Sequence, residues 1–455
     1  MINIKYGNVW CYISPQDQKL IKDSCRFKKE IFKRGMYGME KVSYENSMIK
    51  NNRFLSGLIN RVNQYCENKN IDILYKEHFT TLNKIEPSLK HIIFRDDQKK
   101  AISQAVTKGR GIIKAPTGSG KTVIAGGICS TTPHARILFL CHTLDLLTQT
   151  YEEFNSFGLS NVKMLGGGNK IYTDEIDDPC IIVSTIQTLH KLNPSIFKSF
   201  DMVIIDECHH VTDGSSYTKF LESVDIPIRI GLTATPPQDH FKKLTVEGYL
   251  GDIIAELTIE EGMEMGIIAK PFIDLIAVPY ISRIGELKSY REIYQKAVIE
   301  NKTRNHLILE YALDAINKKQ SVLILTGKEI EHGTILKQMA KEAFGKDIPF
   351  LYGLTSKEDR TYHKNLLKNK ELQCAIANII WYEGINIPPI DIIINAEGGK
   401  ASGKTLQKVG RGLRTSEGKD KLIIVDFLDP YKYLSHHCVL RLSTYAEQGW
   451  LKPNY

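Results

Sequence analysis

The chain has 455 residues, of which 42% are apolar and 25% charged, and its net charge is +8. These values are typical of a soluble globular protein with two or three domains. There is no run of about 18 apolar residues, so we expect no membrane span. The residues Met1–Lys5 lack a signal-peptide pattern, and the nine cysteines include no C-x-x-C pair, which excludes the usual zinc modules. We therefore expect reduced thiols and a cytoplasmic location, in the host cytoplasm if the chain is viral.

The first fifth of the chain carries nearly all of the net positive charge. Residues 1–90 contain 16 Lys and Arg against 9 Asp and Glu. The segment Arg26–Arg34 interleaves cations with Phe27 and Phe32, so it can hold phosphates with its cations and bases with its rings. The same segment also fits a solvated amphipathic helix with both Phe side chains in the core, and the two interpretations are compatible. A second helical pattern covers Phe54–Tyr65.

From residue 89 onward, short apolar runs alternate with helical patterns. Continuous apolar strands separated by helices predict a parallel sheet that is buried on both faces. The pattern occurs twice, before and after a helical connector over residues 285–318, so we predict two tandem α/β domains. The predicted strands are 111–113, 137–140, 180–183 and 202–205 in the first set and 322–325, 374–377, 392–394 and 422–425 in the second.

The segment Ala115–Thr122, Ala-Pro-Thr-Gly-Ser-Gly-Lys-Thr, lies between a predicted strand and a predicted helix. This context predicts a phosphate-binding loop, because glycines let backbone N–H groups converge on a phosphate and the helix N-terminus adds its positive dipole. Lys121 is expected to neutralise β- and γ-phosphate oxygens, and Thr122 to hold Mg²⁺. We therefore expect ATP and Mg²⁺ as cofactors. The predicted cofactor contacts in the loop are Thr117, Gly118, Ser119, Gly120, Lys121 and Thr122.

A second segment, Gly398–Thr405, satisfies the strict G-x-x-x-x-G-K-[ST] pattern, which the first segment does not. A phosphate-binding loop also needs an acidic residue on a neighbouring strand to hold Mg²⁺. The pair Asp206–Glu207 follows a predicted strand and meets this need for the first loop, whereas the second has only Asp426. We therefore predict that the first loop binds the triphosphate and that the second is a polar loop facing nucleic acid or the first site.

Five further segments accompany the phosphate-binding loop, and they are Arg95–Gln98, Asp206–His209, Thr233–Pro236, Glu383–Pro388 and Gln407–Arg414. The six motifs occur in the order found in superfamily 2 helicases of the DExH type, so the chain from about residue 89 to 430 resembles that family. In that family the five segments are the Q motif, the DExH box, the coupling motif, motif V and motif VI. The layout is also similar to phage recombination helicases of the UvsW type and, more distantly, to the XPB-like group.

Phosphoryl transfer to water needs charge neutralisation and an oriented nucleophile. Asp206 is expected to hold Mg²⁺, and Glu207 to orient and deprotonate the attacking water. Gln407, Arg411 and Arg414 are spaced to lie on one face of a helix, and arginines presented in this way can stabilise the transition-state charge.

The resemblance implies further nucleotide and coupling residues. Arg95 and Gln98 are expected to contact the adenine, and Gly384 and Asn386 to contact the nucleotide. Asn386 stands where an aspartate is common, so it can bond a ribose hydroxyl but carries no charge. The residues expected to couple hydrolysis to the other motifs are His209, Thr233 and Thr235.

The run Cys208–His210 is not expected to bind a metal, because adjacent residues on one turn cannot easily converge on a tetrahedral ion. We expect His210 to be a packing or surface residue.

The resemblance also implies that nucleic acid crosses both domains and is held mainly by its backbone. Ser184–Thr185 also fits an ordinary helix cap, and that alternative stays open. The expected contacts are Thr143, Ser184, Thr185, Gln187 and Gly353, together with the loop 398–405.

We predict an α/β protein with two tandem RecA-like parallel-sheet domains, 89–280 and 281–455, after a small basic α+β domain, 1–88, that binds DNA. The favoured function is an ATP-dependent DNA helicase or translocase that unwinds or branch-migrates forked or branched DNA in recombination, replication or repair.

The expected partner is single-stranded, forked or branched DNA, and the chain is expected to act as a monomer, with recombination or replication proteins as further partners. The motifs do not separate DNA from RNA. An RNA helicase or RNA-dependent ATPase, a motor subunit of a restriction or packaging machine, and a binding protein without hydrolysis are the alternatives.

Overall fold

The computed structural model describes residues 1–35, 38–76, 84–169, 178–378, 390–399, 421–447 and 450–451. The chain divides into two compact units. One comprises Met1–Ala115 and Gly120–Leu257, and the other comprises Thr258–Tyr455 with the short loop Pro116–Ser119. None of the helices in the described ranges has the length and apolarity that crossing a membrane requires.

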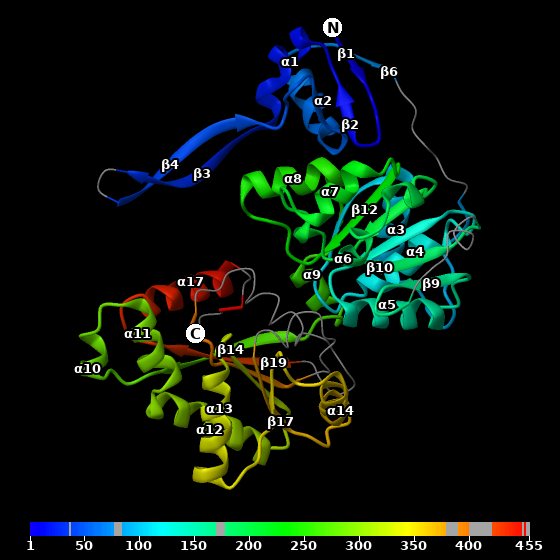
Figure 1. Ribbon diagram of the computed structural model, residues 1–455. Coiled ribbons are helices and arrows are strands. Elements are labelled where there is room, and N and C mark those ends of the chain that lie inside the picture. The colour runs from blue at the N-terminus through cyan, green and yellow to red at the C-terminus, as the bar shows by residue number, and fades with distance from the viewer. Residues whose placement is uncertain are drawn as a thin grey trace. The chain divides into compact units, whose positions relative to one another are not determined.

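The N-terminal segment is an α+β structure, as predicted. Its small sheet has the order β5-β2-β1-β6, and the strands β3 and β4 form a separate antiparallel ribbon that is long and narrow (Figure 1). The elements are β1 (Ile2–Lys5), β2 (Trp10–Tyr12), α1 (Pro15–Ile21), η1 (Lys22–Cys25), β3 (Arg26–Gly35), β4 (Gly38–Ser47), β5 (Arg53–Leu55), η2 (Ser56–Leu58), α2 (Ile59–Asn68) and β6 (Ile73–Lys76).

Two sequence interpretations need correction here. The segment Arg26–Arg34 is not a helix, because its residues pair one by one with β4. Phe27 is nevertheless buried in the core, as expected. The helix predicted over Phe54–Tyr65 begins only at Ile59, because the residues before it form β5 and the turn η2.

The N-terminal segment packs against helix α8 (His240–Leu250) of the first α/β domain. The rings of Phe27 and Phe241 lie 4.5 Å apart between centroids. A Cβ atom on Gly57 would stand 2.1 Å from the carbonyl oxygen of Glu247, so only glycine allows this approach. Buried apolar residues from both sides form one continuous core cluster. The segment is therefore joined to the motor domain by a shared core rather than by a linker alone.

The first α/β domain has a seven-stranded sheet in the order β13-β7-β12-β11-β8-β10-β9, and all its pairings are parallel. Its elements are α3 (Asp96–Lys108), β7 (Arg110–Lys114), α4 (Lys121–Ser130), β8 (Ile137–Cys141), α5 (Leu144–Ser156), β9 (Val162–Leu165), β10 (Ile181–Thr185), α6 (Ile186–Leu189), η4 (Pro194–Phe197), β11 (Met202–Ile205), η5 (Cys208–His210), α7 (Ser216–Ser223), β12 (Ile228–Thr233), α8 and β13 (Ile253–Glu256).

The strands of this sheet are apolar on both faces, as the continuous apolar runs predicted. Ile112 and Leu138 lie in the core cluster that includes residues of α7 and α8. Their chain neighbours Ile113 and Phe139 point to the opposite face, in the cluster with residues of α3, α4 and α5. Because all strands run the same way, their carboxyl ends share one edge of the sheet, which is where ligands bind in open α/β folds.

The second α/β domain has a six-stranded parallel sheet in the order β14-β19-β18-β15-β17-β16, so the predicted tandem of parallel-sheet domains is confirmed. Its elements are α9 (Ile259–Glu264), β14 (Lys270–Ala277), α10 (Ser282–Gly285), α11 (Tyr290–Tyr294), η6 (Gln295–Ile299), α12 (Lys302–Asn317), β15 (Val322–Thr326), α13 (Ile330–Phe344), β16 (Phe350–Leu351), α14 (Lys357–Lys368), β17 (Cys374–Asn378), β18 (Ile392–Asn395), β19 (Lys421–Leu428) and α17 (Leu434–Glu447).

The predicted boundary after residue 280 is too late. Strand β14 pairs with β19 along its whole length, so it belongs to the second sheet. The division between the two compact units falls between Leu257 and Thr258. Sequence pattern alone missed this because the partner of β14 lies about 150 residues further along the chain.

Candidate nucleotide site

The loop after β7 turns through two glycines before α4 begins at Lys121. Gly118 has φ 87° and Gly120 has φ 90°, values that a residue with a Cβ adopts only with strain. The Lys121 ammonium donates to the carbonyl oxygen of Ala115 at 3.1 Å, so it lies back across the loop. Thr122 follows on the first turn of α4, where its hydroxyl is at the helix N-terminus.

Ser119 supports the loop from inside. Its hydroxyl donates to the carbonyl oxygen of Pro116 at 2.7 Å, and the side chain is 1% exposed. Thr117 is half-buried and Gly118 is exposed. The predicted contact of Ser119 with a nucleotide is therefore limited to its backbone, because the hydroxyl is already used within the loop.

The Q-motif residues lie against this loop. The Arg95 backbone N–H donates to the Gln98 side-chain oxygen at 3.1 Å, and the Arg95 guanidinium holds both carboxylate oxygens of Asp97. Gln98 is 2% exposed, and its amide nitrogen lies 2.7 Å from the place a Cβ on Gly120 would take. The glycine is thus needed for the Q motif to pack on the loop.

Two carboxylates follow β11 at the carboxyl edge of the sheet. Desolvation and the neighbouring Glu207 raise the pKa of Asp206 to about 6, while the Lys121 ammonium opposes the rise. The ionised form of Asp206 is therefore destabilised in the nucleotide-free protein. Oxygen ligands and negative charge are what Mg²⁺ requires, so Asp206 and the hydroxyl of Thr122 fit this ion.

Glu207 is held in an unusual backbone conformation, with φ 49° and ψ 50°. A non-glycine residue in this left-handed region costs on the order of 1–3 kcal/mol, and such strain clusters at functional sites. Its carboxylate lies 3.3 Å from His209 Nδ1. The same ring nitrogen lies 3.0 Å from the Thr233 hydroxyl, which also accepts from the Thr235 N–H at 3.2 Å. The structure therefore brings the three predicted coupling residues into one chain of contacts with Glu207.

The candidate nucleic-acid contacts of the first domain separate into two groups. The Ser184 hydroxyl is fully buried and donates to the Leu165 carbonyl oxygen at 2.8 Å. Thr185 is 2% exposed and caps α6 by accepting from the Thr188 N–H. Thr185 is therefore a helix cap, which is the alternative given above. The prediction that the side chains of Ser184 and Thr185 contact a phosphate is wrong, because neither hydroxyl reaches the surface.

Thr143 and Gln187 lie where a ligand can reach them. Thr143 caps α5 with its hydroxyl, and Gln187 is exposed and donates to the His142 carbonyl oxygen at 3.3 Å. In the second domain, Gly353 follows β16, and its carbonyl oxygen accepts from Arg360 at 3.2 Å. Contact of these residues with nucleic acid stays a prediction.

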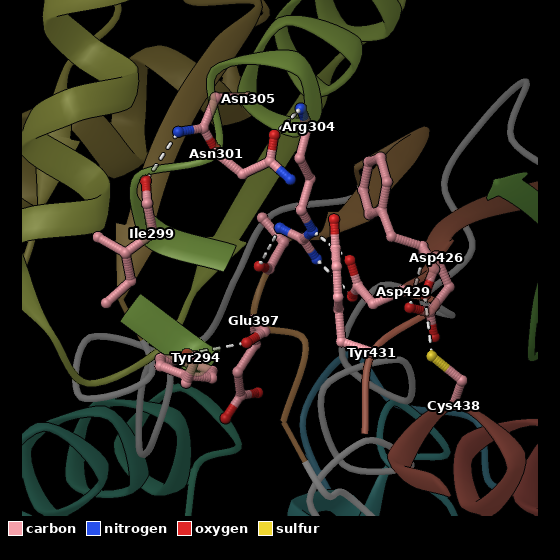
Figure 2. A network of polar contacts seen from close by, with 12 residues as sticks. Tyr294, Ile299, Asn301, Arg304, Asn305, Glu397, Asp426, Asp429, Tyr431 and Cys438 are labelled. Atoms are coloured by element: carbon pink, nitrogen blue, oxygen red, sulfur yellow. Dashed lines mark hydrogen bonds and ion pairs between the residues drawn. The ribbon is translucent and has the colours of Figure 1, made fainter. Parts of the chain in front are cut away.

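The start of the second glycine-rich segment is clamped by side chains of three helices. The guanidinium of Arg304 on α12 donates to the Ala396 carbonyl oxygen at 2.9 Å. The Tyr294 hydroxyl donates to that of Glu397 at 2.8 Å, and Arg441 to that of Gly399 at 2.9 Å. Figure 2 shows Tyr294 and Arg304 reaching toward this turn. The clamped groups are carbonyl oxygens, whereas a phosphate-binding loop presents N–H groups.

Asp426 cannot serve the second segment as a metal-binding acid. It is 2% exposed, and its carboxylate accepts from Arg441 at 2.8 Å and from the Tyr445 hydroxyl at 2.9 Å. Its other oxygen accepts from the Phe427 N–H at 2.8 Å. These contacts support the prediction that only the first loop binds a triphosphate.

Several predicted site residues lie outside the described residues. They are Gly384, Asn386, Gln407, Arg411 and Arg414, together with the part of the loop 398–405 that begins at residue 400.

Sequence reasoning missed the buried ion pairs of the second domain. Arg304 and Asp429 are both 0% exposed and lie 2.9 Å apart. Arg441 pairs with Asp426 at 2.8 Å. The available signal was an isolated arginine in an otherwise apolar helical segment, Cys438–Leu442, since a buried charge needs a partner.

Comparisons with known proteins match both α/β domains of the chain to helicase-type families. Residues 91–238 match the family described as type III restriction enzyme, res subunit, and residues 303–416 match the helicase conserved C-terminal domain. The ATP-dependent DNA helicase uvsW of Enterobacteria phage T4 is 24% identical over 446 residues, which cover 89% of this chain and 88% of that protein.

Two further comparisons extend the likeness. The DNA 3'-5' translocase XPB2 of Sulfurisphaera tokodaii is 26% identical over 368 residues, covering 73% of this chain and 81% of that protein. The solved Hef helicase domain of Pyrococcus furiosus has the same fold, with a TM-score of 0.53, 15% identity and coverage of 78% of this chain and 100% of that one. This chain is an ATP-hydrolysing nucleic-acid helicase that is similar to UvsW-type and XPB-like helicases.

Replacing the lysine of each glycine-rich segment tests which one binds the triphosphate. Lys121→Ala removes the ammonium beside Asp206, so ATP hydrolysis should fall by about 100-fold or more. Lys404→Ala is the matched control and should leave nucleotide affinity within about threefold of wild type. Equilibrium binding of a fluorescent ATP analogue and steady-state hydrolysis measure both effects. Equal loss of nucleotide binding in the two variants contradicts the single-site assignment.

Asp206→Asn should raise the thermal stability of the nucleotide-free protein while abolishing hydrolysis. Folding raises the pKa of Asp206 from 3.8 to about 6. Above about pH 6 the carboxyl group is ionised in the folded protein, and its charge lowers the free energy of unfolding. Below about pH 4 it is protonated in both states and this cost is absent. The gain in Tm should be about 2–4 °C at pH 7 and absent at pH 4.

Differential scanning fluorimetry across this pH range provides the measurement. The exposed Glu152→Gln on α5 is the control and should change Tm little at either pH. A gain for Asp206→Asn that does not vary with pH would show that desolvated charge is not its source.

Proposed function

We propose that this chain couples ATP hydrolysis to the unwinding or branch migration of forked or branched DNA in recombination, replication or repair. The observation that carries the hydrolytic part of the proposal is the contact chain that joins Glu207, His209 and Thr233 beside a glycine loop with its lysine. The matched relatives named as DNA helicase and DNA translocase support DNA as the substrate.

Each residue of the site has a separate role in hydrolysis. Thr122 and Asp206 are the residues that would hold Mg²⁺, which neutralises phosphate charge when bound. Lys121 donates to the Ala115 carbonyl oxygen and would turn toward the phosphate oxygens of a bound triphosphate, because an ionic contact is stronger than a hydrogen bond to a neutral carbonyl group. Glu207 orients the attacking water and accepts its proton, and His209 holds the Glu207 carboxylate toward Thr233.

The N-terminal ribbon is the part of the chain best suited to grip DNA outside the motor domains. Residues 26–47 contain six Lys and Arg against three Glu. Lys28 has a side chain that is 73% exposed, and Tyr44 is 39% exposed. Exposed cations with an aromatic ring can hold a phosphate backbone and stack on a base. Because the ribbon is narrow and two-stranded (Figure 1), it can reach into a groove or between strands at a junction.

Steady-state ATPase rates with single-stranded, duplex, forked and four-way DNA and with RNA of the same sequences test the substrate. Forked or four-way DNA should stimulate hydrolysis most, and a strand-exchange assay on a four-way junction should show ATP-dependent product. Strongest stimulation by RNA would instead establish the RNA helicase.

Glu207→Gln should keep nucleotide and Mg²⁺ binding but stop turnover, because the amide cannot accept the proton of the attacking water. Loss of a general base slows hydrolysis by about 10²–10⁴-fold. The variant should accumulate in an ATP-bound complex on DNA, measurable as slowed dissociation of a labelled fork. A hydrolysis rate within about threefold of wild type removes Glu207 from this role.

Removing the cations of the ribbon should weaken fork binding and flatten its salt dependence. Each phosphate contact that is lost lowers the slope of log affinity against log salt by roughly 0.9 on duplex DNA. The test variant replaces by alanine Lys28, Lys33, Arg34 and Lys41. The matched control replaces by alanine four exposed lysines outside the ribbon, Lys5, Lys19, Lys50 and Lys69.

Fluorescence anisotropy with a labelled fork at several salt concentrations compares the two variants. Fork unwinding should suffer more than DNA-stimulated hydrolysis in the ribbon variant. The control variant can also lose as much fork affinity as the ribbon variant, with the same decrease in salt dependence. That result would show that DNA binding depends on the overall positive charge and that the ribbon makes no specific contribution.

A further inference from the structure

Two histidines from different motifs stack face to face in the first domain. His142 follows β8, and His210 ends the turn η5 after the DExH box. Their ring centroids lie 3.8 Å apart and the planes are inclined by only 5°. The ring of His209 lies 4.3 Å from that of His210. His210 is therefore a packing residue, as expected, and its ring joins the segments that follow β8 and β11.

On one side the stack is tied to the hydrolytic residues. The backbone N–H of His210 donates to the backbone carbonyl oxygen of Glu207 at 3.0 Å. Glu207 is the residue with the left-handed backbone, so a shift of His210 acts directly on that strained peptide. His209, next in the chain, contacts both Glu207 and Thr233.

On the other side the stack is tied to the candidate nucleic-acid contacts. His142 directly precedes Thr143, the residue that caps α5. The His142 carbonyl oxygen accepts from Gln187 at 3.3 Å. A ligand that engages Thr143 or Gln187 therefore acts on the backbone of His142 within one residue or one hydrogen bond.

The environment favours a neutral ring at His210. Burial, together with the neighbouring imidazoles of His209 and His142, lowers the pKa of His210 to about 3. The rings of His142 and His210 also lie parallel and close, and aromatic contacts of this kind are directional.

We propose that the His142–His210 stack transmits nucleic-acid engagement at Thr143 and Gln187 to the hydrolytic residue Glu207. The two histidines are positioning residues, since neither contacts the reacting atoms. The inference rests on the proposed function, because it takes Thr143 and Gln187 as nucleic-acid contacts. A coupling of this kind is a difference in free energy between the engaged and free states, and typical couplings change a rate or affinity by about 5–150-fold.

The test compares ATP hydrolysis by the full chain, with and without saturating forked DNA, in six proteins. Five of them are the wild type, His142→Ala, His210→Ala, the double variant, and His210→Phe, which keeps a ring that can stack. The exposed His134→Ala is the control for loss of a histidine elsewhere in the domain. Tm is measured for each protein to detect a purely structural effect.

Both single alanine variants should keep basal hydrolysis within about twofold and lose about fivefold or more of the DNA stimulation. The double variant should be no worse than either single variant, since both remove the same contact. His210→Phe should recover most of the stimulation, and His134→Ala should behave as wild type.

Unchanged stimulation in the alanine variants overturns the inference alone, provided that the wild type is stimulated by DNA. Additive losses in the double variant, or equal falls in basal and stimulated rates together with a lower Tm, also overturn it. A wild type that no nucleic acid stimulates would remove the proposed function together with the inference.

Discussion

The rest of the nucleotide site depends on keeping two adjacent carboxylates in a poorly solvated position beside one ammonium group. Ionised Asp206 next to Glu207 costs stability, because burial and like charge both raise the pKa of Asp206. The parallel sheet makes this arrangement possible, since β7 and β11 end at the same edge and bring Lys121 to the carboxylates. The same edge brings Thr233 at the end of β12 to His209. A divalent cation would lower the cost of ionising Asp206, so ligand binding and stability are linked at this point.

Buried carboxylates in the second domain are treated differently. Asp429 forms an ion pair with Arg304, and Asp426 forms one with Arg441. Both arginines also donate to carbonyl oxygens of the turn after β18. Such pairs add little net stability compared with apolar packing, but breaking one leaves an uncompensated charge and is costly. They therefore fix the turn at Ala396–Gly399 in one conformation. A paired carboxylate of this kind is structural, whereas the charge left uncompensated at Asp206 marks a ligand site.

Much of this architecture could be predicted from the sequence because the strands of a parallel sheet carry a strong local pattern. The apolar runs at 137–140 and 322–325 became β8 and β15 within one residue. Errors arose where pairing partners are distant or where one pattern fits two structures. Arg26–Arg34 fits either a helix or a strand, and the pairing with β4 decides. The burial of Ser184 depends on the neighbouring strand β9, which supplies the Leu165 carbonyl oxygen. The His142–His210 contact joins the segments that follow two parallel strands, and no local sequence pattern indicates it.

The N-terminal segment and the motor domain share one core, and this determines how the role of the N-terminal segment can be studied. Gly57 and Gly248 let the two parts approach so closely that a Cβ on either would overlap its neighbour. Removing residues 1–88 would therefore uncover Phe241 and other apolar residues of α8, and the remaining domain would lose stability as well as any grip on DNA. Substitutions confined to exposed positions of the ribbon avoid this confusion. The same packing has a mechanical consequence. Helix α8 follows the coupling motif Thr233–Pro236 by a few residues, so the packing of Phe27 on Phe241 connects the ribbon to the segment that carries Thr233.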